Sequence, residues 1–173
     1  VNATYSGIAG YDRCPENGKT NWATMYSLTQ GLQHELGIQE LSHAFGPTTM
    51  SKVDARGGVG PGEQNKNIVN IIKCAFYCKG YPGGDLDGIW RSSPPFGPQQ
   101  DAVAGSLYAM TDNMGIGKQD RLNAKLFKAL LTMDAYVLVA GGDPEVRKIQ
   151  QWLNGRYWRR SFATLIPTEG HYS

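Results

Sequence analysis

The stretch that decides the fold is NIVNIIKCAFYCKGYPGGDLDGIW, from Asn67 to Trp90. Its first half places apolar residues at steps of three and four, the pattern of one face of an amphipathic helix. The residues on this face are Ile68, Ile71, Ile72, Ala75 and Phe76. The pattern stops at Gly80, and glycine commonly ends helices because it adopts positive φ without strain. We therefore predict a helix over 67–79, followed by a loop rich in glycine and aspartate.

Two further apolar patterns lie downstream of this loop. The segment FGPQQDAVAGSLYAMTDNMGIG, at 96–117, predicts a second helix with Val103, Leu107 and Met110 facing inward. A third helix is expected from about Leu122 to Met133. Three helices in this order make one complete unit, which we place at 65–135.

The chain before this unit predicts only two helices. In TNWATMYSLTQGLQHELGI an apolar stripe again recurs at helical spacing, with Thr20 or Asn21 as N-cap and Gly37 as the stop. Pro47 suits the first turn of a short helix that follows. We interpret 1–60 as the second and third helices of a partial repeat.

The end of the chain begins the same pattern again. Asp143 and Pro144 suit the start of a helix, and its stripe consists of Val146, Ile149, Trp152 and Leu153. In addition, 1–21 can be aligned with 153–173 without a gap. We interpret 143–173 as the first helix of a further repeat, which completes the first unit either within one chain or between two chains. The expected state is therefore a monomer or a swapped dimer.

Composition excludes several classes of protein. The 173 residues carry a formal net charge of +2, and no apolar run is long enough to span a membrane. A DNA-reading helix at 122–133 would carry only Lys125 and Lys128, too few cations for phosphate binding. The tightest basic cluster is Arg156, Arg159 and Arg160. We expect neither nucleic acid nor a membrane as partner.

The middle unit carries three short motifs in a fixed order. They are Gly80–Tyr81 after the first helix, then Asp87–Gly88, then Phe96–Gly97–Pro98 before the second helix. This order resembles the peptidoglycan-binding domains that are appended to bacterial wall hydrolases. The chain departs from the family's pattern by the insertion IWRSSPP and by Gln100, where threonine is usual.

The resemblance implies an all-α fold of tandem three-helix bundles with long loops rich in glycine and proline. It also implies an extracellular, wall-bound module that binds the glycan or the stem peptide of peptidoglycan and serves a linked amidase, muramidase or peptidase domain.

Sugars present apolar C–H faces and hydroxyl groups, so their sites combine exposed aromatic rings with amides or carboxylates. One loop of the middle unit offers such residues, and we take Trp90 as the preferred contact. The candidate ligand-binding residues are Tyr81, Asp85, Asp87, Trp90 and Gln99.

Structural roles for these aromatic and acidic residues stay open beside the binding roles. Tyr81 could instead be a packing lid over the bundle, and Asp87–Gly88 is first of all a turn. Trp152 lies on the helical stripe and is expected in the core. Trp158 is expected either to be exposed or to pack under the loop before Ile166.

No pattern of catalytic or metal-binding residues emerges. His34, His43 and His171 lie in three separate segments without the spacing of a zinc motif. Glu35 and Glu40 flank one helix end instead of facing each other across a cleft.

The three cysteines, Cys14, Cys74 and Cys78, are interpreted as small buried hydrophobes. We expect a non-enzyme without cofactor or metal. The alternatives are a protein-interaction or spacer module, or else an amidase or muramidase in its own right.

Overall fold

The protein is described here by a computed structural model, which places residues 1–91, 101–132 and 141–171. Within these ranges the regular elements are helices, joined by one isolated antiparallel bridge between Val59 and Leu122. The helices are α1 (Asn2–Tyr5), α2 (Trp22–Glu35), α3 (Pro47–Ala55), α4 (Lys66–Cys78), α5 (Ala102–Asn113), α6 (Ala124–Leu131) and α7 (Pro144–Tyr157). The prediction of an all-α fold is confirmed.

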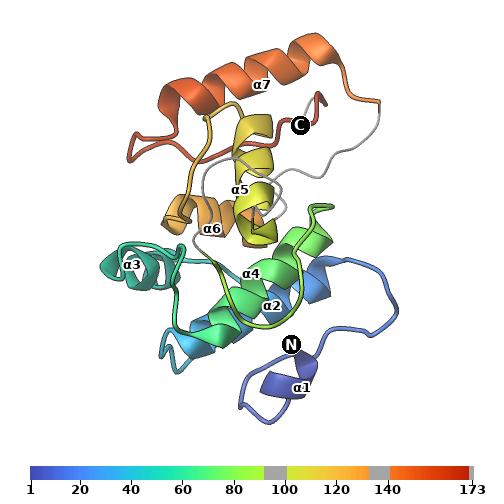
Figure 1. The fold of residues 1–173 in the computed structure, drawn as a ribbon, viewed down its shortest axis with the longest axis vertical. Helices are drawn as coiled ribbons and strands as arrows, with labels where there is room; N and C mark the ends of the chain where they lie inside the picture. Colours follow the sequence, from blue (N-terminus) through green and yellow to red (C-terminus); the bar gives the residue numbers. More distant parts are fainter. Residues whose placement is uncertain (92–100, 133–140, 172–173) are drawn as a thin grey trace.

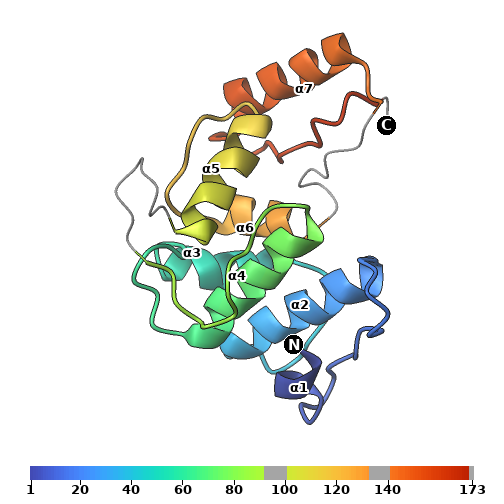
Figure 2. The same cartoon turned by 45° about the vertical axis from the view of Figure 1, so that its right-hand side comes forward.

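The helix α4 is at the centre of the core. It packs against α2 on one side and against α5 and α6 on the other, while α3 lies against α6 (Figures 1 and 2). Ile68, Val69, Ile71 and Ile72 are at most 2% exposed, so α4 is apolar around much of its circumference. The helices of 1–60 and 65–135 thus share one hydrophobic core. A tandem of separate three-helix bundles is not confirmed, and the division into repeats stays a prediction.

The predicted helix ends agree with the structure. Asn21 caps α2 by accepting a hydrogen bond from the backbone N–H of Thr24, and Asp143 caps α7 in the same way through Glu145 and Val146. The chain leaves α2 and α4 through Gly37 and Gly80, whose φ angles are +71° and +80°. The residues that start and end these helices could therefore be predicted from the sequence.

The outward face of α7 contradicts one prediction. Trp152 and Ile149 are 61% and 59% exposed, so the expectation that Trp152 lies in the core is wrong. The inward face of α7 is polar: the Gln151 side-chain amide donates to the Asn113 carbonyl at 2.9 Å. The buried Asn154 side chain makes two hydrogen bonds with the backbone of Ile166. Amide groups therefore hold α7 in place where an apolar stripe was expected.

A close backbone approach accompanies these polar contacts. A Cβ atom on Gly155 of α7 would lie 2.6 Å from the carbonyl oxygen of Gly115, which follows α5. Gly115 itself has a φ of +74°, in the left-handed region that favours glycine. The two glycines allow α7 to lie directly on the turn after α5.

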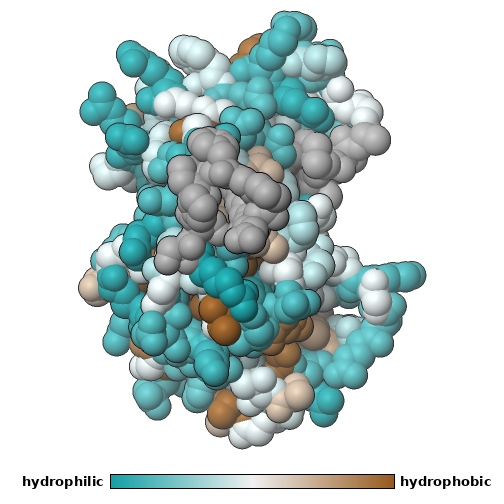
Figure 3. All heavy atoms as spheres, in the orientation of Figure 1, coloured by the Kyte–Doolittle hydropathy of each residue, from teal (hydrophilic) through white to brown (hydrophobic). Residues whose placement is uncertain are grey.

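The surface is mixed in character. Figure 3 shows a mostly hydrophilic face on which apolar side chains reach the surface in the lower half, over the region of α4. Among the placed residues, no helix combines the length and apolar character needed to cross a membrane.

Candidate functional site

Tyr81, the first predicted site residue, packs into the core. Its side chain is 5% exposed and its ring meets that of Phe76 edge to face, with 6.2 Å between the ring centroids. Its hydroxyl oxygen accepts a hydrogen bond from the Asn113 side-chain amide at 3.0 Å. The packing-lid interpretation of Tyr81 is the one that fits this position.

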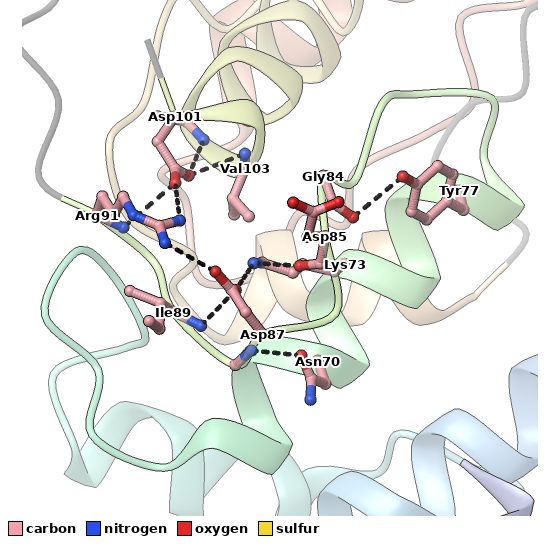
Figure 4. A network of polar contacts seen from close by, with 12 residues as sticks. Asn70, Lys73, Tyr77, Gly84, Asp85, Asp87, Ile89, Arg91, Asp101 and Val103 are labelled. Carbon is pink, nitrogen blue, oxygen red and sulfur yellow. Dashed lines mark hydrogen bonds and ion pairs between the residues drawn. The ribbon is translucent and has the colours of Figure 1, made fainter. Parts of the chain in front are cut away.

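Asp87 lies at the centre of a network of polar contacts (Figure 4). Lys73 of α4 donates to its Oδ1 at 2.5 Å, and the Arg91 guanidinium donates to its Oδ2 at 2.8 Å. Arg91 in turn lies 3.9 Å from Asp101, the N-cap of α5. The side chains of Lys73 and Asp101 are 2% and 5% exposed, whereas those of Asp87 and Arg91 are 30% and 57% exposed, so a chain of charges with buried ends ties α4 to the start of α5.

The electrostatics of this network favour an ionised Asp87. The Lys73 ammonium group, the Ile89 backbone N–H and the Arg91 guanidinium all donate to the carboxylate, and they hold the pKa of Asp87 well below its ordinary value of 3.8. Both carboxylate oxygens are already engaged. Asp87 therefore acts chiefly as an anchor for the loop 81–91.

The remaining predicted site residues do not come together as a binding face. Asp85 is exposed, and its backbone carbonyl accepts a hydrogen bond from Lys73 at 2.6 Å. Trp90 is 2% exposed, so the expectation that it offers an open ring to a ligand is wrong. It is buried because the ion pairs on either side of it fasten its loop to the core. Gln99 lies outside the described residues.

A groove on another part of the molecule has the features of a binding site. It consists of two adjoining hollows of about 200 and about 570 Å³, which share Met50, Lys125 and Ser161 in their walls. The floor comes from α3 and α6, and the opposite wall from the segment 158–165 after α7. Volumes of this order suit a peptide or a sugar unit.

The wall after α7 is held in place by Lys125. Its ammonium group donates to the carbonyl oxygen of Trp158 at 2.8 Å and also to that of Arg160. Burial lowers the pKa of Lys125. Trp158 is 8% exposed, which fits the expectation that it packs and not the alternative that it is exposed. The Arg159 guanidinium covers its ring at 5.2 Å from the centroid.

The charges along the groove are mainly positive. Lys125, Lys128 and Arg159 are accompanied by one carboxylate, Asp54, whose Oδ1 accepts from the backbone N–H of Ala124 at 3.3 Å. An anionic or hydroxyl-rich ligand suits this lining. Sequence reasoning noted Lys125, Lys128, Arg159 and Trp158 separately. Nothing in the sequence shows that α6 and 158–160 face each other, because that contact joins residues more than thirty positions apart.

Metal chemistry finds no support in the part of the chain that the structure describes. There, no three residues among histidine, cysteine, aspartate and glutamate come together as a metal site. Cys14, Cys74 and Cys78 are free and only half-buried, which is less than the burial expected of them.

One family model matches the C-terminal part of the chain. Residues 139–173 match the family model described as "FadG/YbfG, PGDB-like domain", which suggests a peptidoglycan-binding-like domain. The matched residues include the wall of the groove at 158–165. They fall on the last predicted segment, whereas the resemblance in the sequence rested mainly on the middle unit.

Two curated relatives extend over the whole chain. The chain is 45% identical to the uncharacterized protein FadG of Bacillus subtilis (strain 168) over 100% of its own length and 29% of that protein. It is 37% identical to the uncharacterized protein YbfG of the same organism over 99% of its length and 22% of that protein. The chain therefore spans less than a third of the length of these relatives. No solved structure matches the chain.

Proposed function

We propose that this chain is a non-catalytic module that binds bacterial peptidoglycan outside the cell and holds a linked wall-acting domain on its substrate. The observation that carries the proposal is the position of the family match, since residues 139–173 supply one wall of the cationic groove. The predicted ligand site at 81–99 is not part of this proposal, because its described aromatic residues are buried.

The chemistry of the groove is compatible with peptidoglycan. Stem peptides carry carboxylates, which Lys128 and Arg159 can meet from opposite sides of the groove. Arg159 is exposed and Lys128 is half-buried, so both remain accessible to solvent. Such surface ion pairs each contribute about 0.5–1 kcal/mol, which predicts weak binding that depends on salt.

Co-sedimentation with purified bacterial sacculi tests this function. The double variant Lys128→Glu with Arg159→Glu should bind about fivefold more weakly or worse, because two attractive contacts become repulsive. A charge-matched control, Lys19→Glu with Lys148→Glu, changes exposed lysines elsewhere and should bind like the unaltered chain. Absence of wild-type binding, or equal losses in both variants, would contradict the proposal. Release of reducing sugar or free amine by the chain alone would contradict its non-catalytic part.

A second candidate function, a protein-interaction or spacer module, is favoured by the outward face of α7. Ile149 and Trp152 of α7 are 59% and 61% exposed, and Phe162, in the segment after α7, is 76% exposed. Contiguous exposed apolar patches mark interaction surfaces. Light scattering separates a monomer from a swapped dimer. A dimer that dissociates on Trp152→Ala substitution would favour this second function.

A further inference from the structure

A ladder of three rings lies at the N-terminal end of α2. Trp22 and Tyr26 are one helical turn apart and stack with 5.8 Å between centroids at an interplanar angle of 25°. His43, from the loop between α2 and α3, stacks on Tyr26 with 4.1 Å between the ring centroids and an interplanar angle of 6°. We call Trp22, Tyr26 and His43 the ring ladder. Its outer members remain open, with Trp22 51% exposed and the His43 side chain 52% exposed.

Buried polar groups hold a carboxylate beside this ladder. The Asp12 Oδ2 atom accepts from Gln30 at 3.0 Å and contacts the His43 Nε2 atom at 2.8 Å. The Asp12 backbone is fixed as well, because its N–H donates to Gln30 and its carbonyl accepts from Ser27. Gln30 and Ser27 are at most 2% exposed, so a loop carboxylate is held rigidly against α2. Among the described residues, the hydrogen bonds to the Asp12 carboxylate go to its Oδ2 atom, and the side chain is 66% exposed, so Oδ1 faces solvent.

The geometry of the ladder selects a ligand class. Rings that stack nearly parallel present a flat apolar platform, whereas a quaternary ammonium ion requires rings that surround it as a cage. The Asp12 Oδ2 atom already contacts Gln30 and His43, which leaves Oδ1 as an acceptor for one hydroxyl donor at the edge of the platform. A flat apolar face with hydroxyl groups along its edge describes a pyranose ring.

We propose that the ring ladder, together with Asp12, is a binding site for a pyranose ring of a glycan chain. Trp22 supplies the stacking surface and the Asp12 Oδ1 atom accepts a hydrogen bond from a sugar hydroxyl. The site is separate from the cationic groove: in Figures 1 and 2 the beginning of α2 and the helix α3 lie on opposite sides of the core. The inference rests on the proposed wall-binding function only for the source of the sugar.

The platform is organised before any ligand arrives. Its three rings and its carboxylate come from three segments of the chain, which hydrogen bonds to buried side chains of α2 hold together. A ligand would therefore bind without a cost for ordering the loop.

A titration with a soluble β-1,4-linked tetramer of N-acetylglucosamine tests the proposal. In nitrogen–proton spectra of the full chain, the indole signal of Trp22 should shift on addition of the sugar at millimolar concentration, while that of Trp152 stays in place. Trp22→Ala should weaken binding by about tenfold or more, since a stacking surface is lost. Asp12→Asn keeps the shape of the side chain and should weaken binding less. The matched control is Trp152→Ala, which removes a tryptophan of similar exposure on α7 and should bind like the unaltered chain.

The outcomes separate this proposal from the wall-binding function. Absence of a shift with the tetramer, or equal losses in the Trp22 and Trp152 variants, would overturn the sugar site. A shift of the Trp22 signal with choline chloride and none with the tetramer would also overturn it, in favour of a cation. Loss of sacculus binding in the groove variant with tetramer binding intact would leave both proposals supported. Failure of the wild type to bind sacculi, with the tetramer still bound, would remove the wall-binding function alone. Circular dichroism of each variant is the control for retention of the fold.

Discussion

Trp90 and Lys73 are both buried where the sequence favoured exposure. Lys73 is charged but 2% exposed, and Trp90 was expected on an open loop but is equally buried. Both follow from the ion pair between Lys73 and Asp87, which lie 14 residues apart in the sequence. The Asp-Gly turn could be predicted locally, and Gly88 does have a φ of +71°. The partner of Asp87 could not be predicted, because nothing in the local sequence distinguishes a buried lysine from a solvated one.

Replacement of Trp90 should reveal its structural role. Trp90→Ala empties a fully enclosed volume and should lower the free energy of unfolding by about 3–5 kcal/mol. Urea unfolding measures the loss. Trp22→Ala removes the same ring from an exposed position and should cost much less. Equal losses in the two variants would show that Trp90 is not enclosed.

The acid side of the stability curve should depend on Lys73. A carboxyl group whose pKa is depressed by folding stabilises the protein above its ordinary pKa, and this contribution is lost as the pH falls through the folded pKa. Stability should therefore decline below about pH 4, where the carboxyl group of Asp87 is protonated in the unfolded chain but still ionised in the folded protein. The Lys73→Met variant should be less stable than the unaltered chain at neutral pH. Its urea unfolding midpoint should also fall less than that of the unaltered chain when the pH is lowered. Lys148→Met, which breaks an exposed pair with Glu145, provides the control and should keep the wild-type slope.

At the scale of elements, helix starts and stops were predictable but the direction of a helix face was not. A stripe at helical spacing shows which side chains share a face. It does not show whether that face meets the core, and for α7 the expectation was wrong. The buried Asn154 and its bonds to Ile166 would have pointed to the correct face, but an isolated asparagine in a helix carries no such signal in the sequence.

The attachment of α7 should depend on Gly155. In Gly155→Ala the new Cβ meets a backbone oxygen that cannot turn aside, so α7 must lift from the turn at Gly115. We expect a loss of about 1–3 kcal/mol and faster hydrogen exchange within α7 than in α4. Gly7→Ala, where the space around the new atom is open, is the control. Unchanged exchange in α7 would contradict the close approach.

At the scale of the molecule, the helical class was predicted and the shared core was not. The middle three helix patterns were assigned to one another, and the terminal segments to a separate unit, which favours separate bundles. Instead α2 crosses α4, since the apolar surface of α4 is too wide for α5 and α6 alone to cover. The groove could not be predicted either, because its walls come from elements far apart in the chain.

The shared core predicts how a fragment behaves. Residues 65–135 expressed alone would expose the face of α4 that α2 covers, at about 25 cal/mol for each Å² of apolar surface. We expect the full chain to unfold in one cooperative thermal transition, followed by circular dichroism, and this fragment to lack such a transition. A fragment that unfolds cooperatively would support an independent middle repeat.

The four tryptophans divide into two enclosed indoles, Trp90 and Trp158, and two in contact with water, Trp22 and Trp152. In each pair, one tryptophan lies near the core formed by helices α2 to α6, and the other lies in α7 or directly after it. Intrinsic fluorescence therefore contains a blue-emitting and a red-emitting contribution from both parts of the molecule, and a soluble quencher reaches only the second. In Trp22→Phe the red-emitting, quencher-accessible contribution comes from Trp152 alone, so this variant reports movement of α7 without any attached dye.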